Sequence, residues 1–385
     1  MAKIVHLTSV ATTLHVRIFA KQCRSLAAAG NDVVLLCTHT HNEVIDGVTI
    51  KTVGKPRSRL ARMLGTTRKI FAAALREDAD LYVAHDPELM PVAWLLSKLG
   101  RAAVYDMHEY TPGQLLAKHW VPRVLRRSAS WSMRLLQRLM LGRLPVVFAE
   151  SSYAKHYPYV RRSATVLNMP FRGEAAPRFG RPTVGYIGGV APLRGSTVTI
   201  EALELLAAVG RAVDFECIGP AEPTHAAELR RRGHALRPAD IRVRGYEPSG
   251  SGWRRIARCH AGLAVLSPVP NYYESFPGKM FEYMSFGVPV IVSDFPLYRE
   301  VVDQTGCGLC VDPRSPRAVA DAIAWLIDNP EGAAAMGRRG KEAVDGRWNW
   351  GVEFEALLSF YDALLAPRGV RVCRGGVEQL PAAAA

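Results

Sequence analysis

The chain has 385 residues, 49% of them apolar, which is enough for two ordinary hydrophobic cores and long for a single domain. It holds no run of about 18 uncharged apolar residues, and MAKIVHLTSV lacks the features of a signal peptide, so we expect a cytoplasmic protein without a membrane-spanning helix. The formal charge of +14, from 49 basic and 35 acidic residues, indicates a polyanionic partner: nucleic acid, an anionic membrane surface or a phosphorylated substrate. A composition that simply favours arginine would give the same charge.

The seven cysteines argue against a disulfide framework, because their number is odd and they are scattered through apparent strands and helices. Cys307 and Cys310 have the Cys-x-x-Cys spacing of redox and zinc sites. A redox site would need a helix start and a zinc site a second pair, whereas GCGLCVD is typical of a short strand after a turn. We therefore expect these two thiols to pack in the core.

In the first half of the chain, apolar strand-like runs alternate with segments of helical spacing. This alternation predicts a parallel sheet covered by helices on both faces. The expected strands are 3–9, 32–38, 47–53, 80–85, 102–108 and 145–151, and the expected helices include 17–29 and 60–76.

The second half repeats the scheme, after a linker without periodicity over 169–182. We expect an α/β protein of two Rossmann-like, doubly wound domains that face each other across a cleft lined by the loops after the strands. The expected strands are 183–189, 213–219, 241–245, 262–268 and 288–294, with helices at 196–208 and 316–328. The expected domains are 1–170, joined by a C-terminal helix over about 351–366, and 171–350, followed by a disordered tail over 367–385.

The most specific motif follows the strand at 262–268 and reads PVPNYYESFPGKMFEYMSFGVPVIVSDFP. Glu274 lies in its loop and Glu282 in a helix expected to begin near Pro277, with the cap at Ser275 or Phe276. A carboxylate accepts two hydrogen bonds from a vicinal diol, which ribose and hexoses both offer. The helix N-terminus favours an anion such as a diphosphate, and Lys279 adds positive charge there. The alternative is that neither glutamate binds a ligand: Glu274 would be a solvated loop residue and Glu282 a surface position of the helix.

With its flanking residues, this segment resembles the E-x7-E motif of retaining glycosyltransferases with the GT-B fold, and is most similar to glycosyltransferase family 4. The similarity extends over about residues 1–365 and is weakest over 110–160. In that family the first glutamate lies near the transferred sugar and the second binds the ribose of the nucleotide. The resemblance therefore implies these roles for Glu274 and Glu282.

A second motif, VGYIGGVAPLRGSTVTIEAL, takes a strand through Gly188 and Gly189 into a helix. Paired glycines let backbone N–H groups approach a phosphate, and Arg194 supplies a bidentate donor at the helix start. A tight turn needs glycine even without a ligand. The matching stretch of family 4 commonly has two basic residues; Arg194 corresponds to the second, whereas Gly189 stands at the first, and Lys279 is our candidate for the missing charge.

Candidate residues on the N-terminal, acceptor side follow the strands at 80–85 and 102–108. The runs HDPELMP and YDMHE both resemble family 4, in which a histidine after the fifth strand faces the donor phosphate and sugar. That role implies His108 as a catalytic residue, beside Glu274, Arg194 and Lys279. We expect structural roles for His85 and Asp86. On the acceptor side, the candidates are the small and hydroxylated residues at 9–13, His15 and Arg17.

A basic stretch over 113–143 contains seven lysines or arginines and no acid, with Trp120 and Trp131 interleaved. The segment 56–69 adds five more basic residues. Basic amphipathic helices with tryptophan suit anionic membrane surfaces, although the apolar positions would serve equally well as core. Nucleic acid is the less favoured partner, because the sequence has neither an RNP-like aromatic strand nor a helix-turn-helix pattern.

Together with these features, the resemblance to family 4 implies a retaining hexosyltransferase-like enzyme that moves a sugar from a nucleoside-diphosphate sugar to an acceptor hydroxyl. Polysaccharide, glycolipid and glycosylated natural-product biosynthesis are its candidate settings, and a lipid-linked acceptor and a peripheral membrane location are compatible with the basic stretch. No Asp-x-Asp metal motif stands in a strand-end loop, so we expect no metal and no other cofactor. The alternatives are a nucleotide-sugar epimerase on the same fold and a non-catalytic nucleotide-sugar or nucleic-acid binding protein.

Overall fold

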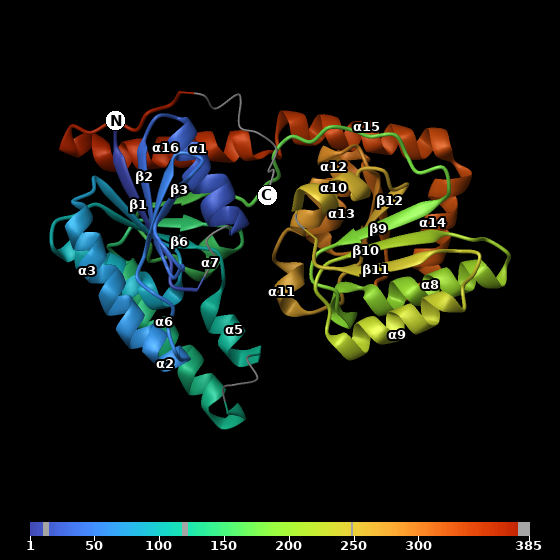
Figure 1. Ribbon diagram of the computed structural model, residues 1–385, viewed down its shortest axis with the longest axis horizontal. Helices are drawn as coiled ribbons and strands as arrows, with labels where there is room; N and C mark the ends of the chain where they lie inside the picture. The colour runs from blue at the N-terminus through green and yellow to red at the C-terminus, as the bar shows by residue number, and fades with distance from the viewer. Residues whose placement is uncertain (11–14, 118–121, 248, 376–385) are drawn as a thin grey trace. The chain divides into compact units, whose positions relative to one another are not determined.

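The computed structural model describes residues 1–10, 15–117, 122–247 and 249–375, which form two compact units (Figure 1). Unit 1 comprises Met1–Asn168 and the described chain from Trp350 onward; unit 2 comprises Met169–Asn349. No helix in these ranges is both long and apolar enough to cross a membrane.

Unit 1 is built on an eight-stranded sheet of order β3-β4-β2-β1-β5-β6-β7-β8, parallel except for β3 against β4. Apolar β-branched runs such as DVVLLC form its strands, and their nearly continuous burial is typical of a sheet covered on both faces. The strands are β1 (Lys3–Leu7), β2 (Asp32–Cys37), β3 (Glu43–Ile45), β4 (Val48–Thr52), β5 (Leu81–Ala84), β6 (Ala103–Met107), β7 (Val146–Phe148) and β8 (Ser163–Thr165).

Helices cover both faces of this sheet (Figure 1). The buried core of one face draws residues from α3, α4 and α6. The helical elements are η1 (Val16–Cys23), α1 (Arg24–Ala28), α2 (Arg59–Ala61), η2 (Arg62–Thr66), α3 (Thr67–Glu77), η3 (Pro87–Leu89), α4 (Met90–Lys98), α5 (Thr111–Ala117), η4 (Arg123–Leu125), α6 (Arg126–Leu141), α7 (Tyr153–His156), α16 (Trp350–Leu365) and η6 (Ala366–Arg368).

The C-terminal helix α16 packs in unit 1 although it follows unit 2 in the chain. Its Trp350 Nε1 donates to Ser25 Oγ at 2.8 Å, and the Glu353 carboxylate accepts from Leu167 N at 2.6 Å. Residues 367–375, part of the expected disordered tail, also pack on unit 1. Asn31 Nδ2 donates to Cys373 O, and Cys373 N donates to Asn31 Oδ1, which ties this segment to the loop before β2. Residues 376–385 lie outside the described part of the chain.

Unit 2 has a fully parallel six-stranded sheet of order β11-β10-β9-β12-β13-β14. Helices α8, α9 and α14 cover one face, and α10, α12 and α15 lie on the other (Figure 1). The strands are β9 (Thr183–Ile187), β10 (Asp214–Ile218), β11 (Ile241–Gly245), β12 (Ala261–Ala264), β13 (Val290–Ser293) and β14 (Gly308–Val311). The helical elements are η5 (Pro192–Arg194), α8 (Ser196–Ala208), α9 (Pro223–His234), α10 (Ser249–Ile256), α11 (Pro270–Tyr273), α12 (Gly278–Ser285), α13 (Pro296–Thr305), α14 (Pro316–Asp328) and α15 (Pro330–Gly346).

Candidate active site

The strand order of unit 2 reverses between β9 and β12. In doubly wound sheets, ligands bind at such a switch point, beyond the carboxyl ends of the strands. The loops there are 188–195 after β9 and 265–277 after β12. The six donor residues expected from the sequence lie in these loops or in α12: Gly188, Gly189, Arg194, Glu274, Lys279 and Glu282.

Gly188 begins the turn after β9 with φ +128°, a conformation that residues with a side chain rarely adopt. Its N–H donates to Ile218 O at 2.8 Å, which holds the turn against β10. A Cβ at this position would come within 2.6 Å of Lys279 Cε and 3.0 Å of Lys279 Nζ. The lysine therefore lies against the glycine turn, in space that any other residue at 188 would fill.

The Lys279 ammonium is half-buried, with Nζ 5.2 Å from the centroid of the Tyr186 ring. The pKa of Lys279 is lowered to about 8, first by burial and then by the nearby Arg194 charge, while Glu282 acts in the opposite direction. Two cations are thus close enough to repel each other, and a bound anion would relieve that repulsion. Tyr186, which sequence reasoning missed, also donates its hydroxyl to Gly189 O at 2.6 Å and so stiffens the turn.

Arg194 ends η5 with an exposed side chain, and its Nη1 would lie 3.7 Å from a Cβ on Gly189. The next residue, Gly195, has φ +87° and passes so close to Val265 O that a Cβ would lie 2.0 Å from that oxygen. Ser267 N donates to Leu193 O at 3.0 Å, which joins the loop after β12 to the loop after β9. These contacts hold Arg194 at the start of α8.

Helix α12 begins at Gly278, within one residue of the expected start near Pro277, but the expected cap at Ser275 or Phe276 was wrong. Pro277 is itself the cap, because its ψ of 96° is extended although its φ of −76° suits a helix. The Tyr283 hydroxyl accepts from Ile187 N at 3.3 Å and donates to Leu263 O at 3.1 Å, which fixes α12 against both central strands.

The two glutamates of the motif differ in exposure. Glu282, on α12, is half-buried and close enough to act on the Lys279 charge. Glu274 lies just after α11 with an exposed side chain. Unit 2 therefore has one carboxylate, Glu282, near the Lys279 charge and a second carboxylate, Glu274, in the more open loop after α11.

In unit 1, four histidines form a row at the carboxyl ends of β1, β5 and β6. The ring centroids are 5.1 Å apart for His6 and His85, 5.8 Å for His85 and His108, and 6.3 Å for His108 and His15. The strand order reverses between β1 and β5, so this row lies at the switch point of unit 1. Its position matches that expected of a ligand-binding edge.

Asp106, inside β6, anchors the row and is fully buried. Its carboxylate accepts from Arg17 at 2.7 and 3.2 Å, from Gln22 Nε2 at 2.7 Å and from His85 Nδ1 at 2.9 Å. Burial raises the pKa of Asp106, yet the Arg17 charge and the histidine hydrogen bonds outweigh it and hold that pKa well below its usual range. Sequence reasoning missed Asp106; the signal was an acid inside the apolar run AAVYDMH.

Two buried histidines, His85 and His6, continue the hydrogen bonds that begin at Asp106. Burial lowers the pKa values of His6 and His85, so both rings are neutral near pH 7. An ionised Asp106 can only accept, so His85 donates from Nδ1 and its Nε2 accepts from His6 Nδ1 at 2.8 Å. His85, Asp106 and His108 are spaced closely enough to hold a metal ion. Because Arg17 already neutralises Asp106, we interpret the group as a hydrogen-bonded chain from Asp106 through His85 to His6, with the half-buried His108 beside it.

The structure places Arg17 differently from the acceptor-side expectation. Its guanidinium is buried, pairs with Asp106 and donates to Val166 O at 2.9 Å, so it orients Asp106 instead of reaching outward. His15 accepts from Ile18 N at 3.4 Å and caps η1. Burial lowers the pKa of His15 to about 4, and the adjacent His108 acts in the same direction.

The loop after β1 is bound to Asp86, whose Oδ2 accepts from Thr8 Oγ1 at 2.9 Å and from Ser9 N at 2.6 Å. Asp86 is therefore structural here, in agreement with the expected role. The other small and hydroxylated candidates, at 11–13, lie outside the described residues.

Comparison with known proteins identifies the family. Residues 15–157 match the family described as glycosyl transferase 4-like domain, and residues 181–329 match glycosyl transferases group 1. The chain belongs to glycosyltransferase family 4. Membership places it among enzymes and covers both units, with the Gly188 turn and the Glu274–Glu282 motif inside the second match.

Curated relatives of this glycosyltransferase share about half of its length. It is 29% identical over 194 residues to D-inositol 3-phosphate glycosyltransferase of Corynebacterium glutamicum, covering 49% of this chain and 44% of the relative. It is 39% identical over 193 residues to the GDP-mannose-dependent alpha-(1-6)-phosphatidylinositol monomannoside mannosyltransferase of Mycobacterium tuberculosis, covering 47% of each. The matches thus span just under half the length of these relatives.

Solved structures extend the likeness to nearly the whole fold. Sucrose-phosphate synthase from Thermosynechococcus elongatus superposes with a TM-score of 0.72 at 17% identity, over 95% of this chain and all of that one. Anabaena HepE, solved with UDP and glucose, gives 0.67 at 16% identity, over 94% of this chain and all of that one. The glycosyltransferase therefore has the GT-B fold, as the sequence predicted.

Proposed function

We propose that this glycosyltransferase is a retaining enzyme that uses a nucleoside-diphosphate sugar as its donor. The observation that carries the proposal is the convergence of Lys279, Arg194 and the Gly188 turn at the switch point of unit 2. A half-buried ammonium and a guanidinium beside backbone N–H groups fit the charge and shape of a diphosphate.

The same groups would stabilise the leaving diphosphate during transfer. Negative charge builds on it as the glycosidic bond breaks, and fixed positive groups lower the energy of that state without rearranging. We propose that Lys279 and Arg194 provide this charge without a divalent ion. By the family resemblance, Glu282 binds the ribose and Glu274 lies beside the transferred sugar.

His108 would act from unit 1. Its ring lies against neutral His85, which Asp106 orients through Nδ1, and the family resemblance implies that His108 faces the donor phosphate and sugar. We propose His108 as a positioning and hydrogen-bonding group. We propose that the acceptor proton passes to the leaving phosphate.

A phosphorylated or lipid-linked acceptor is the acceptor class that we propose. The relatives from Corynebacterium and Mycobacterium are named for D-inositol 3-phosphate and for phosphatidylinositol monomannoside. The net charge of +14 favours an anionic acceptor electrostatically. Other acceptors in polysaccharide or natural-product biosynthesis are the alternatives that an acceptor screen would separate.

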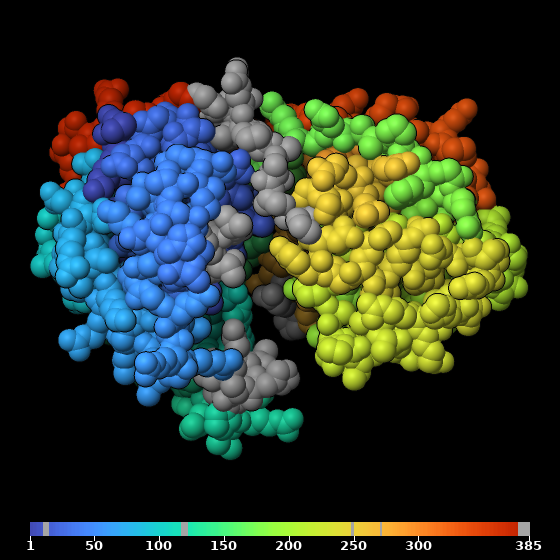
Figure 2. Space-filling view, in the orientation of Figure 1, coloured from blue at the N-terminus to red at the C-terminus, as the bar shows by residue number. Residues whose placement is uncertain are grey.

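We also propose that unit 1 binds an anionic membrane surface through α6. Trp131, Leu135 and Leu139 follow one another at helical spacing of four and are 66%, 44% and 68% exposed. These three side chains do not face the core, whereas Leu136 and Met140 of the same helix pack against it, as the alternative for the apolar positions expected. In Figure 2 the blue-green segment from η4 into α6 projects from unit 1. Lys118 and Trp120 of the same stretch lie outside the described residues.

Arginines flank this exposed apolar stripe, and a cavity opens beside it. The cavity has a volume of about 410 Å³, and Tyr110, Tyr159 and Arg134 are among its walls. Gln137 also lines it, and its buried Nε2 has no hydrogen-bond partner among the described residues. Aromatic walls with an arginine and an unpaired amide suit the head group of an anionic glycolipid acceptor.

Donor binding and stereochemistry test the proposed function directly. A thermal-shift screen over nucleoside diphosphates and their sugars should raise the melting temperature for one base, because a ligand at 100 times its Kd adds about 2.7 kcal/mol of stability. NMR of the glycoside formed with the matching acceptor should show the donor's anomeric configuration. Release of an epimerised nucleotide sugar without acceptor, or an inverted product, would contradict the proposal.

Two carboxamide variants resolve the roles of the motif. Glu282→Gln should raise the donor Kd, since the ribose loses a charged acceptor, whereas Glu274→Gln should lower kcat more than affinity. Wild-type turnover in both variants would refute the assigned roles.

A further inference from the structure

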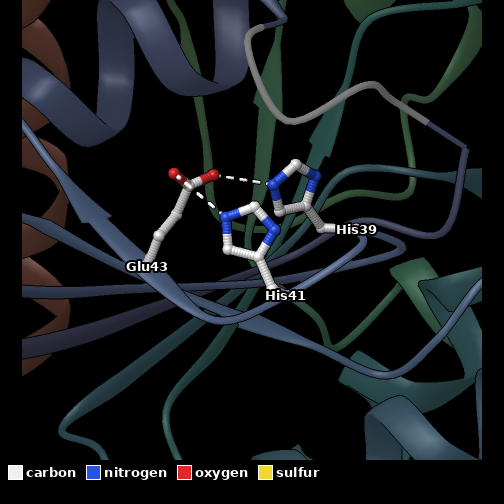
Figure 3. A group of neighbouring side chains, drawn as sticks. All are labelled: His39, His41 and Glu43. Atoms are coloured by element: carbon white, nitrogen blue, oxygen red, sulfur yellow. Dashed lines mark hydrogen bonds and ion pairs between the residues drawn. The ribbon is translucent and has the colours of Figure 1, made fainter.

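Three side chains of types that can bind a metal ion lie close together near the start of β3: His39 and His41 in the connection from β2, and Glu43 at the first position of β3. His39 Nε2 lies 2.6 Å from Glu43 Oε1, and His41 Nε2 lies 3.6 Å from Glu43 Oε2. Figure 3 shows both imidazoles directed at the two oxygens of one carboxylate.

The backbone of this connection is held in place by β4. Thr52 Oγ1 donates to His39 O at 2.6 Å and accepts from His39 N at 3.2 Å. Asn42 Oδ1 accepts from Thr52 N at 2.8 Å, and Glu43 is paired with Ile50 in the sheet. The backbone at His39 and Glu43 is thus fixed by contacts with β4 that do not use the imidazoles or the Glu43 carboxylate.

A hydroxyl fixes the orientation of the more exposed histidine. His41 Nδ1 lies 2.9 Å from Thr40 Oγ1. When Nδ1–H donates to that oxygen, the lone pair of the neutral ring is on Nε2, which faces Glu43. Metal-binding histidines almost always have such a partner on the nitrogen that does not bind the metal.

The distances fit a small tetrahedral cation. Two ligands each about 2.1 Å from zinc lie about 3.4 Å apart. The observed separations of 2.6 and 3.6 Å bracket that value, and all three ligand atoms lie within 4.8 Å of one another. Closing to zinc geometry would need shifts of about an ångström, which side chains at an exposed turn can make.

We propose that His39, His41 and Glu43 form a binding site for a divalent transition metal of the zinc type. Two imidazoles and a carboxylate supply three ligands, and the exposure of His41 leaves a fourth position to water. The site uses none of the residues assigned to sugar transfer. Its metal would join the turn after β2 to the edge strand β3, so we infer a structural role for it in unit 1.

Calorimetry with Zn²⁺ on untagged, chelator-treated protein tests the proposal. We expect one zinc per chain, with affinity reduced roughly tenfold or more in His41→Ala and in Glu43→Gln. Thr40→Val keeps all three ligands but removes the partner of His41 Nδ1, so it should weaken binding about tenfold. The matched control His234→Ala, an exposed histidine of α9, should bind like wild type.

Thiols are the competing zinc ligands, so the titration is best made in a Cys310→Ser, Cys373→Ser background, which removes the two cysteines that are not fully buried. Co²⁺ bound there should show no thiolate-to-metal charge-transfer band. Absence of stoichiometric binding by this protein, or undiminished binding after His41→Ala, would overturn the proposal. Circular dichroism of each variant separates lost ligands from lost folding.

Discussion

The Lys279 side chain occupies the space that a Cβ on Gly188 would need, 2.6 Å from Lys279 Cε. The neighbouring Gly189 is different, because the nearest atom to a Cβ there is Arg194 Nη1 at 3.7 Å, an ordinary contact. One glycine of the pair is therefore required by its surroundings and the other is not. The two positions thus differ both in contact with the lysine and in backbone conformation, because Gly188 has a positive φ and Gly189 does not.

We predict that Gly188→Ala weakens nucleotide-sugar binding roughly tenfold or more, because it displaces Lys279 and strains a backbone with φ +128°. Gly189→Ala is the matched control and should leave the Kd within about twofold. Isothermal calorimetry measures both. Equal effects of the two substitutions would show that the lysine position does not matter for the donor.

Donor affinity should fall as the pH rises above about 8. The pKa of Lys279 is lowered to about 8 in the free protein, and a bound diphosphate favours the ammonium, so binding is full below that pH and is lost as the lysine deprotonates. Between pH 7 and 9 the Kd of an intact nucleotide sugar should rise by up to about tenfold. The Lys279→Arg variant stays charged over this range, so its donor Kd should not change with pH. If its Kd still rises between pH 7 and 9, a group other than Lys279 is responsible for the pH dependence.

Breaking the buried pair in unit 1 should destabilise the fold. Asp106→Asn leaves the Arg17 charge buried without its partner, and such changes typically cost about 3–5 kcal/mol. Urea unfolding measures the loss. Adding Arg17→Met should restore part of it, because the uncompensated charge is removed. A loss below about 1 kcal/mol for Asp106→Asn, the size of an average substitution, would contradict the pairing.

Co-sedimentation with anionic vesicles should depend on α6. Reversing Arg126, Arg127 and Arg134 to glutamate should abolish binding at low salt, since each basic residue near such a surface contributes about 1 kcal/mol. Wild-type binding should itself weaken with salt, as the screening length falls from about 10 Å at 0.1 M to about 3 Å at 1 M.

The control for this experiment reverses three exposed arginines of unit 2, Arg254, Arg317 and Arg338, and changes the net charge equally. It should co-sediment like wild type. If both triple variants lose binding alike, or if the wild type does not sediment with vesicles, α6 is an ordinary solvated surface and a water-soluble acceptor becomes the better proposal.

Regular elements with strong local signals could be predicted from the sequence. Helices α8 and α14 begin and end at the predicted residues, and for α14 the cap is visible in the sequence: Ser315 Oγ accepts from Ala318 N ahead of a proline start. Strands β3 and β8 were missed. Each has three residues, and β8 is largely exposed, so neither forms an apolar run that a pattern could reveal.

The donor loop was visible in the sequence because glycines, a basic residue and two carboxylates lie at short, family-like spacings. The site in unit 1 was harder to predict from the sequence. Arg17 and Asp106 are 89 positions apart, and only the packing of η1 beside β6 turns an apparently free arginine into the buried partner of an acid. Tyr186 and Tyr283 were missed for a related reason, since their hydroxyls act on backbone groups that the fold brings close.

The return of α16 to unit 1 also constrains the order in which the protein can assemble on the ribosome. The strands of unit 1 are synthesised first, but the hydrogen bonds from Trp350 to Ser25 and from Leu167 to Glu353 form only after all of unit 2 has been made. Unit 2 is one uninterrupted stretch and can fold as soon as it emerges. The unit that begins the chain is therefore completed last, and its partly covered sheet must stay soluble for the time needed to translate about half of the protein.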